Sequence, residues 1–136
     1  MPKLQFRFST RELGAGVRRA LFAHKNQATA AMRAIRDTIV KETKRRTPIK
    51  EGFLTASVTG DVVTYEKSMA ATVYIPVNSP AAPYAVWIHE GEYNLGESSL
   101  EKQRKVGVTV GPKYITRAVQ DSRQTIIDHL VGALKL

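Results

Sequence analysis

Apolar and polar residues alternate in two stretches of the chain, LQFRFS at 4–9 and MAATVYIPVN at 69–78. An alternation with a period of two places every second side chain on the same face of a β-strand. A third stretch, LTASVTGDVVTYEK at 54–67, is rich in valine and threonine, which favour strands. The pattern therefore predicts one strand from the first stretch and a pair of strands from the other two, joined by a tight turn near Lys67 and Ser68.

A longer period begins near residue 26, where apolar residues recur every three or four positions. This spacing gathers them on one side of an amphipathic helix, which we predict over 26–46. Pro48 disfavours the helical conformation at Thr47 and has no N–H to donate, so the helix is expected to end there. The apolar positions are Ala28, Ala31, Met32, Ile35, Ile39, Val40 and Thr43.

The second half of the chain gives less regular patterns. The segment YAVWIHEG at 84–91 predicts one or two helical turns that end at Gly91. Residues 92–107 are polar and contain two glycines, and we interpret them as a long loop or a flexible projecting arm. A brief strand is predicted at 108–110, and Pro112 suits the first turn of a final helix.

The two ends of the chain complete the predicted fold. A short helix is expected at 11–22, weakened by Gly14 and Gly16. The final helix carries an apolar stripe at Ile115, Ala118, Val119, Ser122, Ile126, Leu130, Val131 and Leu134. We therefore predict a single α+β domain over 1–136, in which a long helix of the N-terminal half and a C-terminal helix pack on a small antiparallel β-sheet.

Composition excludes several classes of protein. The chain has 136 residues, enough for one core, and no cysteine, which excludes disulfides, thiolate zinc sites and a cysteine nucleophile. The longest apolar run is 82–88, far shorter than the ~20 residues of a membrane helix. No signal peptide is visible at the N-terminus, so we expect a protein that does not enter the membrane.

Charge is distributed in blocks along the chain. Residues 1–50 hold 13 basic and 3 acidic residues, residues 51–100 hold 1 and 6, and residues 101–136 hold 7 and 3. The formal net charge is +9. Such blocks indicate unlike charged faces, which suit either a polyanion or neighbouring protein subunits.

Two groups of residues are candidates for chemistry. His89 and Glu90 could act as a general base or a metal ligand, and a small hydrolase is one alternative function. However, adjacent residues do not share a helix face, and no second histidine lies at metal-motif spacing, because His24 and His129 belong to other predicted helices. We favour a structural role for the pair and expect no metal, no cofactor and no enzyme activity, since no known short catalytic motif occurs.

The basic run KETKRR at 41–46 could bind phosphate groups. The simpler interpretation is a solvated helix end, where cations complement the helix dipole. No aromatic residue interrupts the run, although aromatic side chains are what single-strand binding surfaces use for stacking. A nucleic-acid-binding module that uses the basic N-terminal half is nevertheless the main alternative function.

Three segments in the same order resemble signatures of the neck and tail-completion (head–tail joining, minor capsid-like) proteins of long-tailed bacteriophages. They are TPIKEGFLTAS at 47–57, APYAVWIHEG at 82–91 and VGPKYITRAV at 110–119. Lys50 and Glu51, where the family tends to have aspartate and threonine, His89 and the 92–107 arm depart from the pattern. The positions that match are Pro48, Gly52, Leu54, Ser57, Tyr84, Ala85, Glu90, Gly91, Pro112, Tyr114 and Ala118, and Trp87 lies among them as a candidate core or subunit-contact residue.

The resemblance implies a structural virion protein that acts through assembly. It implies a ring, expected to be hexameric, between a head-side connector or stopper and a tail terminator or tail tube protein, with packaged DNA as a further partner in the lumen. It also implies a location in the virion, and in the host cytoplasm during assembly. The candidate assembly surface comprises Lys41, Lys44, Arg45, Arg46, Glu97, Lys102, Arg104 and Lys105.

Overall fold

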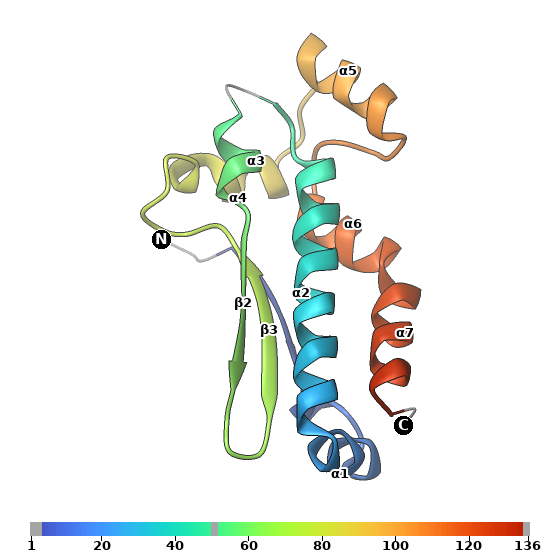
Figure 1. Cartoon of the computed structure of the whole chain (residues 1–136). Coiled ribbons are helices and arrows are strands. Elements are labelled where there is room, and N and C mark those ends of the chain that lie inside the picture. The colour runs from blue at the N-terminus through green and yellow to red at the C-terminus, as the bar shows by residue number, and fades with distance from the viewer. Residues whose placement is uncertain (1–3, 50–51, 135–136) are drawn as a thin grey trace.

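The computed structural model of the chain describes residues 4–49 and 52–134 (Figure 1). Its sheet is antiparallel and three-stranded, with the order β1 (Gln5–Ser9), β3 (Met69–Tyr74), β2 (Thr59–Thr64). Long helix α2 (Lys25–Arg46) lies against the sheet and against the C-terminal helices. The predicted α+β class is therefore confirmed.

Helix α2 supplies the centre of the core. Its periodic positions from Ala28 to Thr43 are buried, apart from the half-buried Val40, as the sequence predicts. The opposing core residues come from β3, where Met69, Val73 and the following Ile75 are buried. The two predicted ends of α2 agree with the structure to within one residue, and Thr47 has the extended backbone that Pro48 imposes.

The hairpin of β2 and β3 has the predicted turn. Thr64 pairs with Met69, and the N–H of Tyr65 donates to the carbonyl of Ser68 at 2.7 Å. The first strand is shorter than predicted, because Phe53–Ser57 forms a helix, α3. Leu54 reaches the core from this helix, so tertiary packing outweighs the strand preference of the local sequence.

The N-terminal helical region is divided in two. A short 3₁₀ helix, η1 (Thr10–Glu12), precedes α1 (Ala15–Ala23), so the single helix predicted at 11–22 is wrong in its first half. The hydroxyl of Ser9 accepts the N–H of Arg11 at 3.2 Å and ends β1 at this point. Leu21 is the residue of α1 that is buried in the core.

Helix α4 (Ala82–Glu90) begins two residues before the predicted helical turn and ends at Gly91, as expected. The loop predicted at 92–107 is wrong over most of its length, because Glu97–Val106 forms helix α5. Glu97 in its first turn and Arg104 and Lys105 in its last turn complement the helix dipole. The flexibility expected for the segment stays a prediction.

The remaining C-terminal predictions need two corrections. No strand forms at 108–110 in the described chain, and the N–H of Val110 instead donates to the Gln103 side chain at 2.9 Å. The final helix is broken at the buried Ser122 into α6 (Tyr114–Asp121) and α7 (Arg123–Leu134), and Pro112 lies ahead of it rather than in its first turn. After this break α7 lies alongside α2, which leaves Val131 and Leu134 of the predicted stripe exposed.

Candidate functional site

The second and third segments that carry the family resemblance meet near the C-terminal end of α2, directly after which the first segment begins. The N–H of Gly111 donates to the carbonyl of Arg46 at 2.9 Å, and the N–H of Lys113 donates to the carbonyl of His89 at 2.6 Å. The buried hydroxyl of Tyr114 donates to the carbonyl of Ala85 at 2.9 Å. We call these contacts the α2 joint. They connect the end of α2, helix α4 and the start of α6, two of them between main-chain atoms and the third through the Tyr114 hydroxyl.

Residues of the first segment shape the exit from α2. Gly52 has φ of +77°, a left-handed conformation that side chains oppose, and it precedes the first residue of α3. Leu54 belongs to the hydrophobic core. The hydroxyl of Ser57 donates to the carbonyl of Phe53 at 2.6 Å, within its own helix. Lys50 and Glu51 lie outside the described residues.

Residues of the second segment divide between the core and the surface. Ala85 is buried and Tyr84 packs against the core. Gly91 ends α4 by donating to the carbonyl of Trp87, and a Cβ at this glycine would lie 2.6 Å from that oxygen. The side chain of Trp87 is 62% exposed and stacks on the ring of Tyr93, with 5.5 Å between the ring centroids. Trp87 is therefore a surface residue rather than a core residue.

Residues of the third segment close the joint. Tyr114 and Ala118 are fully buried, and burial raises the pKa of the Tyr114 hydroxyl above its ordinary value. Lys113 takes the left-handed conformation at φ of +60°, immediately after Pro112 and before the first residue of α6. Its ammonium pairs with the carboxylate of Glu90. Glu90, a matched position of the second segment, is thus bonded to the third.

His89 is buried within this joint. Its Nδ1 lies 2.9 Å from Glu90 Oε1, and its ring meets the ring of Tyr114 edge-on, with 4.8 Å between centroids. Burial lowers the pKa of His89, and the hydrogen bond to Glu90 opposes this only in part. The ring also borders a hollow of about 310 Å³ between β1, α4 and α6. Among the residues lining this hollow, Thr116 has the only hydroxyl.

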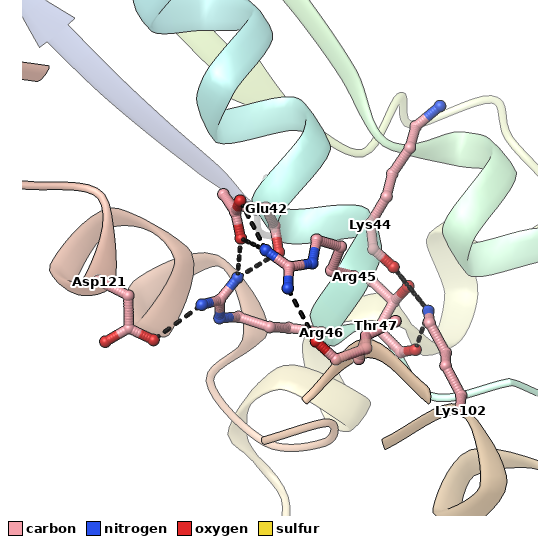
Figure 2. Close-up of polar contacts among 8 residues, drawn as sticks. Glu42, Lys44, Arg45, Arg46, Thr47, Lys102 and Asp121 are labelled. Atoms are coloured by element: carbon pink, nitrogen blue, oxygen red, sulfur yellow. Dashed lines mark hydrogen bonds and ion pairs between the residues drawn. The ribbon is translucent and has the colours of Figure 1, made fainter. Parts of the chain in front are cut away.

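The basic run at the end of α2 is tied into the fold rather than freely solvated (Figure 2). The carboxylate of Glu42 accepts from Arg45 at 2.7 Å and from Arg46 at 2.6 Å. Arg46, only 3% exposed, also bonds Asp121 of α6 at 2.8 Å. Burial alone would raise the pKa of Glu42, but the hydrogen bonds from Arg46 and Arg45 outweigh it and leave that pKa below its ordinary value. The interpretation as a solvated helix end is therefore wrong for Arg46.

Lys102 of α5 completes this cluster from the other side. Its ammonium donates to the carbonyls of Lys44 at 2.6 Å and Thr47 at 2.7 Å, two of the groups that a helix end leaves without partners (Figure 2). It also lies 3.2 Å from the Thr47 hydroxyl and 3.4 Å from that of Thr55. Burial lowers the pKa of Lys102 to about 8. Nothing in the sequence pattern pointed to this contact, because a lysine in a polar segment gives no periodic signal.

The predicted assembly surface consequently separates into two groups. Arg45, Arg46 and Lys102 are occupied by contacts within the chain. Lys44 is half-buried, and its side chain extends away from the carbonyl that Lys102 binds (Figure 2). The exposed members that remain available to a neighbour are Lys41, Glu97, Arg104 and Lys105, the last of which pairs with Glu101 at 3.4 Å.

No metal cluster, membrane-spanning helix or similar protein adds to this description of the described residues. Within residues 4–49 and 52–134, no cluster of three or more metal-binding side chains is present. No helix in the same part of the chain is both long and apolar enough to cross a bilayer. Comparison with protein families, with curated proteins and with solved structures found no match to this chain.

Proposed function

We propose that this chain is a structural protein of a tailed-bacteriophage virion, located at the neck or the top of the tail. Copies of the chain form a ring there, expected to be hexameric, and the ring joins the tail to the head during assembly. The observation that carries the proposal is the α2 joint. The second and third matches, which lie about 20 residues apart, have no reason to meet in space if each is a coincidence, yet they contact each other, and the third also bonds Arg46, the residue directly before the first match.

The surface of the chain supports an assembly role. Large apolar side chains are exposed around the α2 joint, and Trp87 is the most prominent of them. Aromatic residues at the centre of a protein–protein contact contribute much of its binding energy. The exposed apolar residues of this region are Ile49, Phe53, Val77, Trp87 and Leu100. Partners at the neck, a head-side connector or stopper and a tail terminator or tail tube protein, would cover such residues.

A complementation assay tests this proposal. Particles assembled without the chain are expected to accumulate as DNA-filled heads and separate tails, and adding the purified chain is expected to restore joined particles. The double variant His89→Ala/Glu90→Gln is expected to restore joining as well, provided that it folds, because the proposal assigns no catalysis to this pair. Normal joining in the absence of the chain would contradict the proposal, and loss of joining in a folded double variant would favour the hydrolase alternative.

The nucleic-acid-binding alternative has one observation in its favour. Arg19, Lys25 and Arg33 are exposed on α1 and α2, and within the described residues none of them has an ion pair or a side-chain hydrogen bond. Binding through phosphates would show as an affinity for any duplex sequence that falls steeply with salt, by a log–log slope of about −0.9 per phosphate contact. A chain that binds DNA in this way but does not restore joining would favour the alternative.

A further inference from the structure

A hollow of about 500 Å³ lies between α1 and the turn of the β2–β3 hairpin. We call it the α1 hollow, and it is lined by Ala15, Arg18, Arg19, Phe22 and Lys67. Phe22, Ala15 and the aliphatic stems of the arginines make its surface mainly apolar. Its rim is basic, because three of the five lining residues are cationic.

These three cations have no partner in the structure. Within residues 4–49 and 52–134, Arg18, Arg19 and Lys67 form no ion pair and no side-chain hydrogen bond, and Nε of Arg18 is buried without a hydrogen-bond acceptor. Glu66, exposed beside Lys67, is the nearest acid along the chain, and it does not line the hollow. A buried donor without an acceptor is costly, so the hollow favours an occupant that supplies acceptors and an apolar group together.

Another surface of the same chain has these complementary properties. We call it the α4 knob, and it consists of Trp87, Glu92 and Tyr93. The two aromatic rings stack with 19° between their planes, and the hydroxyl of Tyr93 donates to the carbonyl of Ile88 at 2.6 Å, which holds the second ring in place. The carboxylate of Glu92 is exposed and unpaired among the described residues. The knob therefore presents a preformed aromatic face beside free negative charge.

Helix α1, which lines the hollow, and helix α4, which bears the knob, lie toward opposite ends of α2 (Figure 1). Helix α1 adjoins the start of α2, whereas α4 is bound through the α2 joint near its end. The 22 residues of α2 separate the two sites by about 33 Å. The knob of one molecule therefore cannot occupy its own hollow, but it can occupy the hollow of a second copy.

We propose that the α4 knob of one copy docks in the α1 hollow of the next. Arginine guanidinium groups bind the faces of tryptophan and tyrosine rings, and they pair with carboxylates at the same time. Duplex DNA fits less well, because its backbone offers phosphates without an apolar group to fill the hollow. The contact joins two different surfaces, so successive copies form either a closed ring or an open filament. It specifies the subunit contact of the proposed ring and rests on that proposal for its biological setting.

Sedimentation of the full chain, from micromolar to millimolar concentration, tests the contact. The average mass of the unmodified chain is expected to rise with concentration. A hollow variant, Arg19→Glu/Lys67→Glu, and a knob variant, Trp87→Ala/Glu92→Lys, are each expected to associate at least roughly tenfold more weakly, because each removes one half of the contact. All four residues are exposed, and circular dichroism confirms that each variant is folded. If either double variant is unfolded, Arg19→Ala and Trp87→Ala replace it.

Mixing the two variants gives the sharpest result. Each variant retains the surface that the other lacks, so an equal mixture is expected to form a one-to-one dimer and nothing larger. The control Arg33→Glu/Arg123→Glu makes the same change in net charge as the hollow variant at exposed positions outside the hollow, and it is expected to associate like the unmodified chain.

Three outcomes would overturn the contact. They are a constant monomer mass at millimolar concentration, unchanged association of either folded variant, and a mixture that does not dimerise. Short duplex DNA that blocks association and loses affinity for the hollow variant would assign the hollow to nucleic acid instead. Failure of self-association leaves the proposed virion location standing, and absence from the virion leaves a measured self-association standing, so the two proposals fail separately.

Discussion

Helix α5 lies beyond the C-terminal end of α2 (Figure 1), and different forces hold the two helices in place. The buried face of α2 consists mainly of apolar residues that pack against the sheet and α7. Within the described chain, α5 contributes no residue to the hydrophobic core, and polar contacts bind it. Those contacts are Lys102 to the end of α2, Ser99 to the N–H of Ile49, Gln103 to the N–H of Val110, and Arg45 to the carbonyl of Val106.

The difference predicts unequal stability within one chain. Burial of apolar area is the main source of folding free energy, whereas a hydrogen bond contributes only about 0.5–1.5 kcal/mol net. We therefore expect α5 to open in local fluctuations that leave α2 and the sheet intact. Most of the segment 92–107, interpreted from its sequence as a loop or arm, forms helix α5, and polar contacts attach this helix to the rest of the chain. Its local opening stays a prediction.

The largest expected effect separates the two packing modes directly. Ile39, fully buried on α2, is expected to cost about 2–5 kcal/mol of unfolding free energy when changed to alanine, because a cavity remains in the core. Leu100 of α5 is 41% exposed, and the same change there is expected to cost less than about 0.5 kcal/mol. Urea denaturation of the two variants measures both values. Equal losses would show that α5 is part of the cooperative core.

Two glycines with positive φ, Gly52 and Gly107, extend the comparison of α2 with α5. The expected changes in unfolding free energy are smaller than for Ile39→Ala. Gly52→Ala is expected to destabilise the fold by about 1–2 kcal/mol through backbone strain, because φ is +77° while space for the Cβ is free. Gly52→Val is expected to cost more, since a β-branched residue resists this conformation further. Gly107, with φ of +72° at the end of α5, is expected to affect the global melting temperature little when changed to alanine.

Two basic residues serve as the comparison for the Gly52 variants. Lys44→Ala is expected to leave the melting temperature unchanged, because within the described residues its ammonium forms no ion pair or hydrogen bond, and single surface charges change stability by less than about 0.5 kcal/mol. Arg45→Ala removes a contact to α5 and is expected to loosen that helix. A Gly52→Val variant that melts like the unmodified chain would contradict the strain argument.

The titration of His89 tests the α2 joint, which connects α2 with α4 and α6. Burial depresses the pKa of His89 in the folded state, so the unfolded state takes up the proton first as the pH falls. Stability is therefore expected to be complete above about pH 6.5 and to decline below it as the pH approaches the depressed folded value. Denaturation curves between pH 7 and pH 5 measure this decline. Replacing His129 on α7 is expected to leave this decline in stability unchanged. A folded His89→Phe variant whose stability declines by the same amount would exclude His89 as the source.

A change at Lys102 is expected to affect the local opening of α5 and hardly to affect the stability of the whole fold. Lys102→Met keeps the length and apolar stem of the side chain but removes the ammonium that binds the carbonyls of Lys44 and Thr47. We expect faster hydrogen exchange of the α5 amides and little change at α2. Exchange measured by mass spectrometry on both helices tests this. Strong, equal protection of α5 in the unmodified chain and the variant would show that other contacts hold it.

The same contrast explains what the sequence could predict. The period of α2, the stop at Pro48, the hairpin turn and the α+β class are confirmed, because apolar spacing and proline act locally. Helix α5 was not predicted, because Leu100 and Val106 are its only large apolar residues and they form no apolar stripe along the helix. The bond between Arg46 and Asp121 joins residues 75 positions apart, a distance at which sequence spacing carries no information. The matched motif positions were found by resemblance, and the contacts between the second and third segments at the α2 joint could be seen only in the fold.

Locating the chain in assembled particles tests the central claim most directly. Electron micrographs of purified virions, in which the chain carries a dense label at its C-terminus, would show where its copies sit. The account predicts label concentrated in a ring between head and tail, with no label along the tail or on the capsid faces. Virions that join normally and carry no label at the neck would contradict it.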